Sequence, residues 1–221
     1  TFLFAQEKLK FSENTAQSSK ENDVVAKVFK EDVKIIDGNK TLYTDLAIHY
    51  PDSNKVLLKG DVNLYENNDS LSCKQLTIYK GDKERYEASG DVILYKQNKE
   101  IKSQNLIYFT LDQKIIANNN VSIKDSSRII TGDSLYVSYK DSLIDLININ
   151  SNAKLYNNRF VKINGFTALQ FFQDKMESNN IEIQFTQDEK IKDIYLEGMA
   201  IADFSAIKDS IIKGVNHISG D

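Results

Sequence analysis

The chain has 221 residues, and its 41% hydrophobic and 27% charged content is ordinary for a folded domain. Lysine and arginine number 28 against 32 acidic residues, so the formal charge is −4. This balance argues against a nucleic-acid-binding surface, which needs a basic stripe. One proline, no tryptophan, and eleven residues each of tyrosine and phenylalanine favour a β-sheet with tight polar turns.

The first residues, TFLFAQ, are apolar up to Ala5 and then give way to polar sequence. This pattern is typical of the end of a secretory signal peptide, and a short apolar strand is the alternative. We expect residues 1–5 to be the signal remnant, 6–23 a polar leader, and 24–221 a single β-domain cut off at its C-terminus. The chain has no apolar run of about 18 residues that could span a membrane. Its lone cysteine, Cys73, rules out an intramolecular disulfide framework.

A repeat of about 30 residues organises most of the chain. GDVNLY from Gly60 recurs as GDVILY from Gly90, and weaker copies follow. Around each copy, apolar and polar residues alternate with a period of two, which predicts a strand half-buried on one face. The equivalent anchor positions are Val33, Val62, Val92, Val121, Ala153 and Ala200.

Small or turn-prone residues interrupt the inward face at the middle of each predicted strand. A small residue there indicates a sharp bend, because a bulky side chain would clash. The predicted crease residues are Gly60, Cys73, Gly90, Ser103, Gly132 and Gly198. Cys73 is interpreted as a crease filler rather than a reactive thiol.

Short polar linkers such as ENNDS (66–70) and KQNKE (96–100) join the strands as hairpins. The prediction is an all-β fold, a creased antiparallel β-meander that forms an open β-jelly roll, or β-taco, from two-strand repeats. With strands about 4.8 Å apart, roughly ten strands give a body on the order of 50 Å long.

These motifs resemble the OstA-like family, to which the periplasmic lipopolysaccharide-transport protein LptA and the N-terminal domain of LptD belong. The resemblance rests on the recurring GDV-x-L entry followed by S-x-x-L-x-Y, over roughly residues 30–203. The long interval between Ala153 and Ala200 and the tail DSIIKGVNHISGD place it nearest the longer OstA-like proteins of Bacteroidetes-type bacteria. The resemblance implies a periplasmic protein that carries lipopolysaccharide acyl chains between its sheet layers. It also implies that protomers join end to end.

The apolar residues at the inward-facing positions of successive strands, called the inward columns, are then candidates to line a lipid groove. They could equally form a closed core, and the residues alone leave both readings open. The groove candidates are Leu58, Val62, Leu64, Leu76, Ile78, Val92, Leu94, Leu106, Tyr108, Val121, Ile123, Leu135 and Val137. The charge run KGDKER (80–85) reads as a solvated turn, or alternatively as a groove rim where Lys80, Lys83 and Arg85 meet lipid phosphates.

The sequence offers no catalytic motif, metal ligand set or cofactor fingerprint. Asp45 and His49 share a strand face but stand about 13 Å apart, too far to share a metal ion. The expected partners are lipopolysaccharide or a related lipid, other Lpt-type β-jelly-roll proteins through edge strands, and further copies of this chain. The alternative is a structural β-repeat scaffold, at a surface or in a filament, with a dry core.

Overall fold

The computed structural model describes residues 10–12, 15–21 and 24–220, and their structure is almost entirely β-strand. The strands are β1 (Lys10–Ser12), β2 (Thr15–Glu21), β3 (Val24–Asp37), β4 (Lys40–Tyr50), β5 (Lys55–Glu66), β6 (Asp69–Tyr79), β7 (Arg85–Lys96), β8 (Lys99–Phe109), β9 (Lys114–Lys124), β10 (Arg128–Lys140), β11 (Leu143–Lys162), β12 (Leu169–Phe185), β13 (Ile191–Glu197), β14 (Ala200–Lys208) and β15 (Ile211–Gly220). One 3-10 turn, η1 (Pro51–Ser53), holds the single proline. The predicted all-β class is confirmed.

The described chain divides into two compact units. The first comprises the residues up to Gln97 together with Ser103–Asp112, and the second comprises Asn98–Lys102 and everything from Gln113 onward. Residues 1–5, the predicted signal remnant, lie outside the described residues, and the predicted domain boundaries stay predictions.

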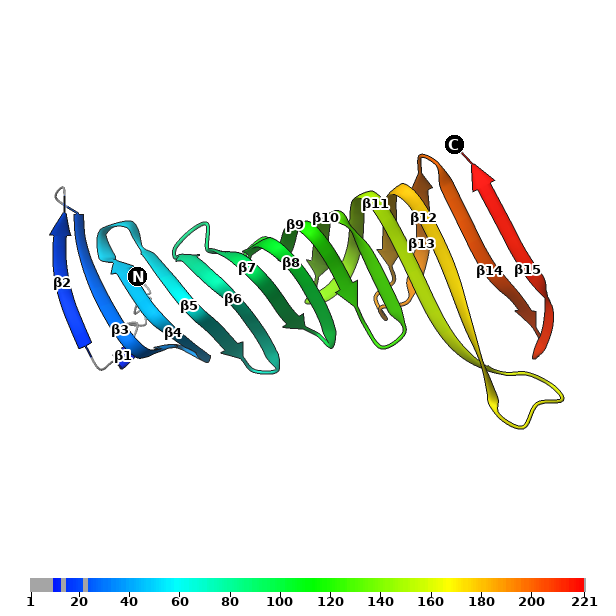
Figure 1. The fold of residues 1–221 in the computed structure, drawn as a ribbon, viewed down its shortest axis with the longest axis horizontal. Helices are drawn as coiled ribbons and strands as arrows, with labels where there is room; N and C mark the ends of the chain where they lie inside the picture. The colour runs from blue at the N-terminus through cyan, green and yellow to red at the C-terminus, as the bar shows by residue number, and fades with distance from the viewer. Residues whose placement is uncertain (1–9, 13–14, 22–23, 221) are drawn as a thin grey trace, which may run out of the picture. The chain divides into compact units, whose positions relative to one another are not determined.

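Within each unit, neighbours in the chain are neighbours in the sheet (Figure 1). The first unit has the order β1-β3-β4-β5-β6-β7, with β2 also paired to β3. The second has the order β9-β10-β11-β12-β14-β15, with β13 also paired to β12. All these pairings are antiparallel, so the predicted meander is confirmed.

The strands form because their apolar residues recur at every second position. In β5, Val56, Leu58, Val62 and Leu64 are buried while Lys59 faces solvent, and most other long strands repeat this pattern. A pleated strand directs alternate side chains to opposite faces, so one face of each strand becomes core.

Each long strand is creased near its middle, where the pairing with its neighbour loses register. In the first unit the shifts fall between Lys30 and Val33 on β3, Tyr43 and Leu46 on β4, Lys59 and Val62 on β5, and Ser72 and Gln75 on β6. In the second unit they fall at Thr131/Ser134 and Gly132/Ser134 on β10 and at Asn150/Ala153 on β11.

Left-handed backbone marks one strand of each creased pair. Gly60, Gly90 and Gly198 have φ of 103°, 77° and 75°. Other copies place non-glycine residues in this region, at Glu31/Asp32, Asn119/Asn120 and Ser151/Asn152. Asn, Asp and Gly tolerate a positive φ best, which explains why the entry motif can decay from Gly-Asp to Asn-Asn. At Gly198 and Met199 the bend interrupts the strand altogether, so β13 and β14 are its two halves.

On the other strand of several creased pairs, a side-chain hydrogen bond supports the bend. Cys73 and Ser178 donate from the side chain to the carbonyl oxygen two residues on, at 3.2 and 2.5 Å. The Thr44 hydroxyl donates to the carbonyl oxygen of Lys59 on β5 at 2.8 Å and lies 3.3 Å from that of Leu46. These bonds replace ladder bonds that the register shift removes. Ser103 is buried in the equivalent place, and its hydroxyl has no hydrogen-bond partner. At Gly132, an added Cβ would lie 2.3 Å from the Cγ2 atom of Ile149.

The crease places the two halves of each strand in two layers, with their buried faces toward each other. In the first unit, one layer ends at the turns 38–39 and 67–68, and the other ends at the turns 51–54 and 80–84. The buried columns fill the space between the layers.

Replacing Gly90 by valine should lower the free energy of unfolding by about 1–3 kcal/mol, because a β-branched residue is strained at φ 77°. Its Cβ would also lie 2.9 Å from the Cβ of Lys74. Gly90→Asn is the matched control, since asparagine meets the same neighbour but tolerates the backbone. Urea unfolding of the three proteins measures the difference. Equal stability of the two variants would contradict a backbone cause.

The Cys73 thiol should be inert in the folded protein. Burial raises its pKa from 9.0 to about 12, outweighing its hydrogen bonds to backbone. At pH 8 the thiolate fraction is then roughly a thousandth of its ordinary value. We expect an aromatic disulfide reagent to label the unfolded protein fully and the folded protein only as it unfolds. Rapid stoichiometric labelling of the folded protein would contradict this.

Candidate functional site

The candidate site is the apolar interior between the two layers of each unit. The side chains predicted to line a lipid groove project into it from the inward positions of the creased strands, and twelve of the thirteen are buried. Their exposed fractions are 0% for Leu58, Leu76 and Val137, 1% for Val62, Val92, Leu106 and Leu135, 2% for Val121, 3% for Ile123, 5% for Leu64 and Ile78, and 6% for Leu94. Tyr108 is half-buried. The structure therefore buries twelve of the thirteen within one or other of the two units.

Polar groups in this interior lie mostly at the creases and the strand ends. Thr44, Ser103 and Ser178 are buried at creases, Lys99 is buried at the start of β8, and Asp174 is buried within β12, where Arg159 pairs with it at 2.8 Å. The other buried inward side chains are Cys73 and aliphatic or aromatic residues. Such an interior can hold hydrocarbon.

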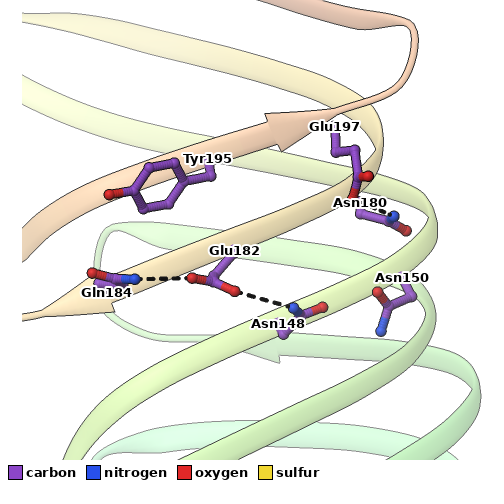
Figure 2. Close-up of a pocket in the computed structure, with 7 residues that line it drawn as sticks. All are labelled: Asn148, Asn150, Asn180, Glu182, Gln184, Tyr195 and Glu197. Atoms are coloured by element: carbon purple, nitrogen blue, oxygen red, sulfur yellow. Dashed lines mark hydrogen bonds between the residues drawn. The ribbon is translucent and has the colours of Figure 1, made fainter.

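On the outer faces of β11, β12 and β13 in the second unit, mostly polar side chains line a cleft of about 260 Å³ (Figure 2). Asn148 and Gln184 donate to Glu182, at 3.4 and 2.9 Å, and Asn180 donates to Glu197 at 3.1 Å. Asn150 and Tyr195 complete the lining. Inward residues such as Ile147 and Ile183 alternate with these side chains, so the cleft faces away from the apolar interior.

The hairpin between β11 and β12 carries exposed aromatic side chains. At the end of β11 and the start of β12, Phe160 and Phe171 pair across the strands with their ring centroids 5.3 Å apart. They are 68% and 55% exposed, and Phe166 and Leu169 beside them are also exposed. Figure 1 shows this yellow hairpin reaching past the turns of β9 and β10. The long interval between Ala153 and Ala200 is the sequence signal of this extension, although the sequence analysis did not single out its aromatic residues.

The last described strand, β15, pairs with β14 on one side, and all ten of its residues are exposed. Among them, Ile211, Ile212, Val215 and Ile218 are large and apolar. An apolar strand at a sheet edge is a template for pairing with another strand.

The histidines stand apart from each other. His217 on β15 lies 2.6 Å from Asp203 at an exposed position. His49 is half-buried, and burial, with a smaller contribution from Lys27, lowers its pKa. Among the described residues no three His, Cys, Asp or Glu side chains gather as a metal site, and none of the helical segments is long and apolar enough to cross a membrane.

Comparison with known proteins bears on the first unit and the start of the second. The family model described as LptA/(LptD N-terminal domain) LPS transport protein matches residues 45–143, just under half of the chain. No curated protein matches the chain. Among solved structures, the chain is similar to LptH, the LptA homologous periplasmic component of the conserved lipopolysaccharide transport device from Pseudomonas aeruginosa. That similarity has 12% identity and a TM-score of 0.28, covering 75% of this chain and 93% of LptH. The nearness to Bacteroidetes-type proteins stays a prediction. Over residues 45–143, the family resemblance that the sequence predicts is confirmed.

Proposed function

We propose that this protein is a non-catalytic periplasmic component that binds and carries lipopolysaccharide or a related lipid. The acyl chains lie between the sheet layers, and other Lpt-type β-jelly-roll proteins pair with its edge strands. The observation that carries the proposal is the repeated two-layer apolar interior, within a segment that matches an LPS transport family. The chemistry of the interior supports it, because apolar columns in successive repeats suit a long hydrocarbon ligand.

Acyl chains enter such an interior by replacing contacts between the layers. The columns consist largely of Leu, Ile and Val, which make non-directional contacts. Exchanging those contacts for contacts with methylene groups conserves most of the buried apolar area, worth about 25 cal/mol per Å². Separation of the layers therefore costs little once lipid fills the space.

A structural scaffold with a dry core is the second candidate function. The near-complete burial of twelve groove candidates favours it, since a preformed groove would leave some of them open to solvent. The two functions differ in whether lipid is bound at all.

A charge in the interior should abolish lipid binding. We expect the purified protein to release lipid on organic extraction, identified by mass spectrometry, and Leu94→Asp to retain about tenfold less or none. Leu94 is 6% exposed, whereas its neighbour Tyr95 on the opposite face is 47% exposed. Tyr95→Asp is therefore the matched control and should retain the lipid. Absence of lipid from all three proteins, with Leu94→Asp simply unfolded, would favour the dry core.

Charges on β15 should weaken end-to-end association, because lysine on an edge strand disfavours strand addition. We expect Val215→Lys/Ile218→Lys to lower the mass of assemblies measured by light scattering at high protein concentration. Phe160→Ser/Phe171→Ser removes a comparable exposed apolar pair on β11 and β12 and should leave the assemblies intact. The reverse result would place the contact on the aromatic hairpin.

A further inference from the structure

Charged residues occupy the last inward-facing positions of the strands in the first unit, where the apolar columns end. Each stands two residues beyond a buried apolar residue, so the strand alternation turns it toward the opposite layer. They are Asp37 beyond Ile35, Lys40 before Leu42, Lys80 beyond Ile78, Glu84 before Tyr86, and Lys96 beyond Leu94, together with Glu66 beyond Leu64 and Asp69 before Leu71. We call the first five residues the seam.

Side chains of the seam connect the two layers. Lys80, which follows β6 in one layer, pairs with Asp37 at the end of β3 in the other. Lys40 lies 3.5 Å from the carboxylate of Glu84 and donates to the Tyr86 hydroxyl at 2.6 Å. These partners are 43 to 46 residues apart in the chain, so the contacts are tertiary and span the interior.

Lys96 makes a third connection. Its ammonium lies 5.3 Å from the ring centroid of Tyr108 in the opposite layer and 3.0 Å from Asp69 on the neighbouring strand. Burial acts to lower its pKa, but the Tyr108 hydroxyl and the Asp69 carboxylate raise it above its ordinary value. The ammonium therefore stays charged at the edge of an apolar space.

The second unit shows the same arrangement independently. Lys99, only 8% exposed, pairs with Glu189 at 3.2 Å, 90 residues along the chain. Arg128 lies over the ring of Phe185 at 5.5 Å and pairs with Asp125. In both units, cations at the ends of the inward columns contact the opposite layer.

Stability alone gives a weak reason for such pairs. Taking a lysine and a carboxylate partly out of water costs about as much as their attraction returns, so apolar residues would hold the layers together equally well. A charged pair differs from an apolar contact because its anion can be exchanged. Another anion can replace the carboxylate as the partner of the lysine, so the buried ammonium is never left unpaired. A phosphate group offers more oxygen acceptors and more negative charge than Asp or Glu.

We propose that the seam binds the phosphate-bearing head group of an amphiphile whose acyl chains lie between the layers. The phosphate oxygens replace Asp37 and Glu84 as partners of Lys80 and Lys40, which parts the layers at the seam as the chains enter. This rests on the lipid carriage proposed above, and it assigns a role to the positions where the head group leaves the apolar interior.

The test compares two ligands that differ only in phosphate: lipid A with two phosphates and the same lipid after enzymatic removal of both. The variant D37N/K40Q/K80Q/E84Q neutralises both sides of each pair, so that no buried charge is orphaned. We expect it to bind the bisphosphorylated lipid about tenfold more weakly, and the dephosphorylated lipid as the unmodified protein does.

The matched control neutralises two exposed ion pairs on outer surfaces in the same manner. D61N/K74Q and D188N/K190Q act on pairs whose side chains are 59–79% exposed. The control should bind both lipids like the unmodified protein. Inorganic phosphate forms a third arm, and it should compete poorly because it lacks the acyl chains.

The outcomes separate the two proposals. Equal loss of phosphorylated-lipid binding in the control, or no loss in the seam variant, would overturn the seam as the head-group site while leaving lipid carriage intact. Failure of the unmodified protein to bind either lipid would overturn lipid carriage itself and the seam role with it. Strong competition by inorganic phosphate alone would identify a free-phosphate site instead.

A second variant guards against misfolding. K40R/K80R keeps the charges and should retain both lipids, with a thermal midpoint close to that of the unmodified protein. If the fourfold variant unfolds, D69N/K96Q applies the same test at the third connection, and retention of full phosphorylated-lipid binding there would overturn the proposal.

Discussion

The bend at the middle of each strand is the constraint on which the rest of the structure depends. An unbent meander would leave one whole apolar face in water. With the bend, the two halves of a strand direct the same face toward each other, and each layer covers the other. The bend costs ladder hydrogen bonds and places residues at positive φ, where L-amino acids other than Asn and Asp are strained and only achiral Gly is fully tolerated. Side-chain donors at Thr44, Cys73 and Ser178 bond to carbonyl groups that the bend would otherwise leave without a hydrogen-bond partner.

The repeat made most of the fold predictable, because period-two alternation and a small residue at a fixed offset are local properties. Val62, Val92 and Val121 could be placed on the inward face from their spacing alone, and the structure buries all three. The sequence alone does not explain why Asn119 and Ser151 replace Gly60 at the equivalent positions of later repeats. Those residues preserve a backbone conformation rather than a side-chain size, and only the φ angles show it.

Contacts between the layers could not be predicted in the same way. Lys40 and Glu84 look like ordinary turn charges in the sequence, since nothing local relates residues 44 positions apart. Their pairing follows from which turns face each other once every strand is bent. The aromatic residues of the β11–β12 extension, Phe160 and Phe171, escaped notice for a related reason. They occupy outward positions, and the inward period-two pattern that identifies the strands carries no information about outward residues.

An apolar interior bordered by charge has the polarity profile of an amphiphile. Its aliphatic columns end in half-buried lysines and acids, with Tyr86 and Tyr108 between the two environments. Tyrosine suits this boundary because its ring is apolar and its hydroxyl is polar. Burial, reinforced by Glu84, raises the pKa of the Tyr86 phenol, which therefore stays a neutral donor beside the Lys40 ammonium.

Within each unit a strand bonds almost exclusively to the strands before and after it in the chain. Stability in such an array is close to a sum over nearest neighbours, and no distant closure has to be satisfied. Length is consequently a parameter that mutation can alter in steps. Inserting or deleting one repeat of two strands would change a unit by about 10 Å while leaving every other bend in its own surroundings. Duplication of a short piece of the gene can thus lengthen such a protein without disturbing the bends that it already has.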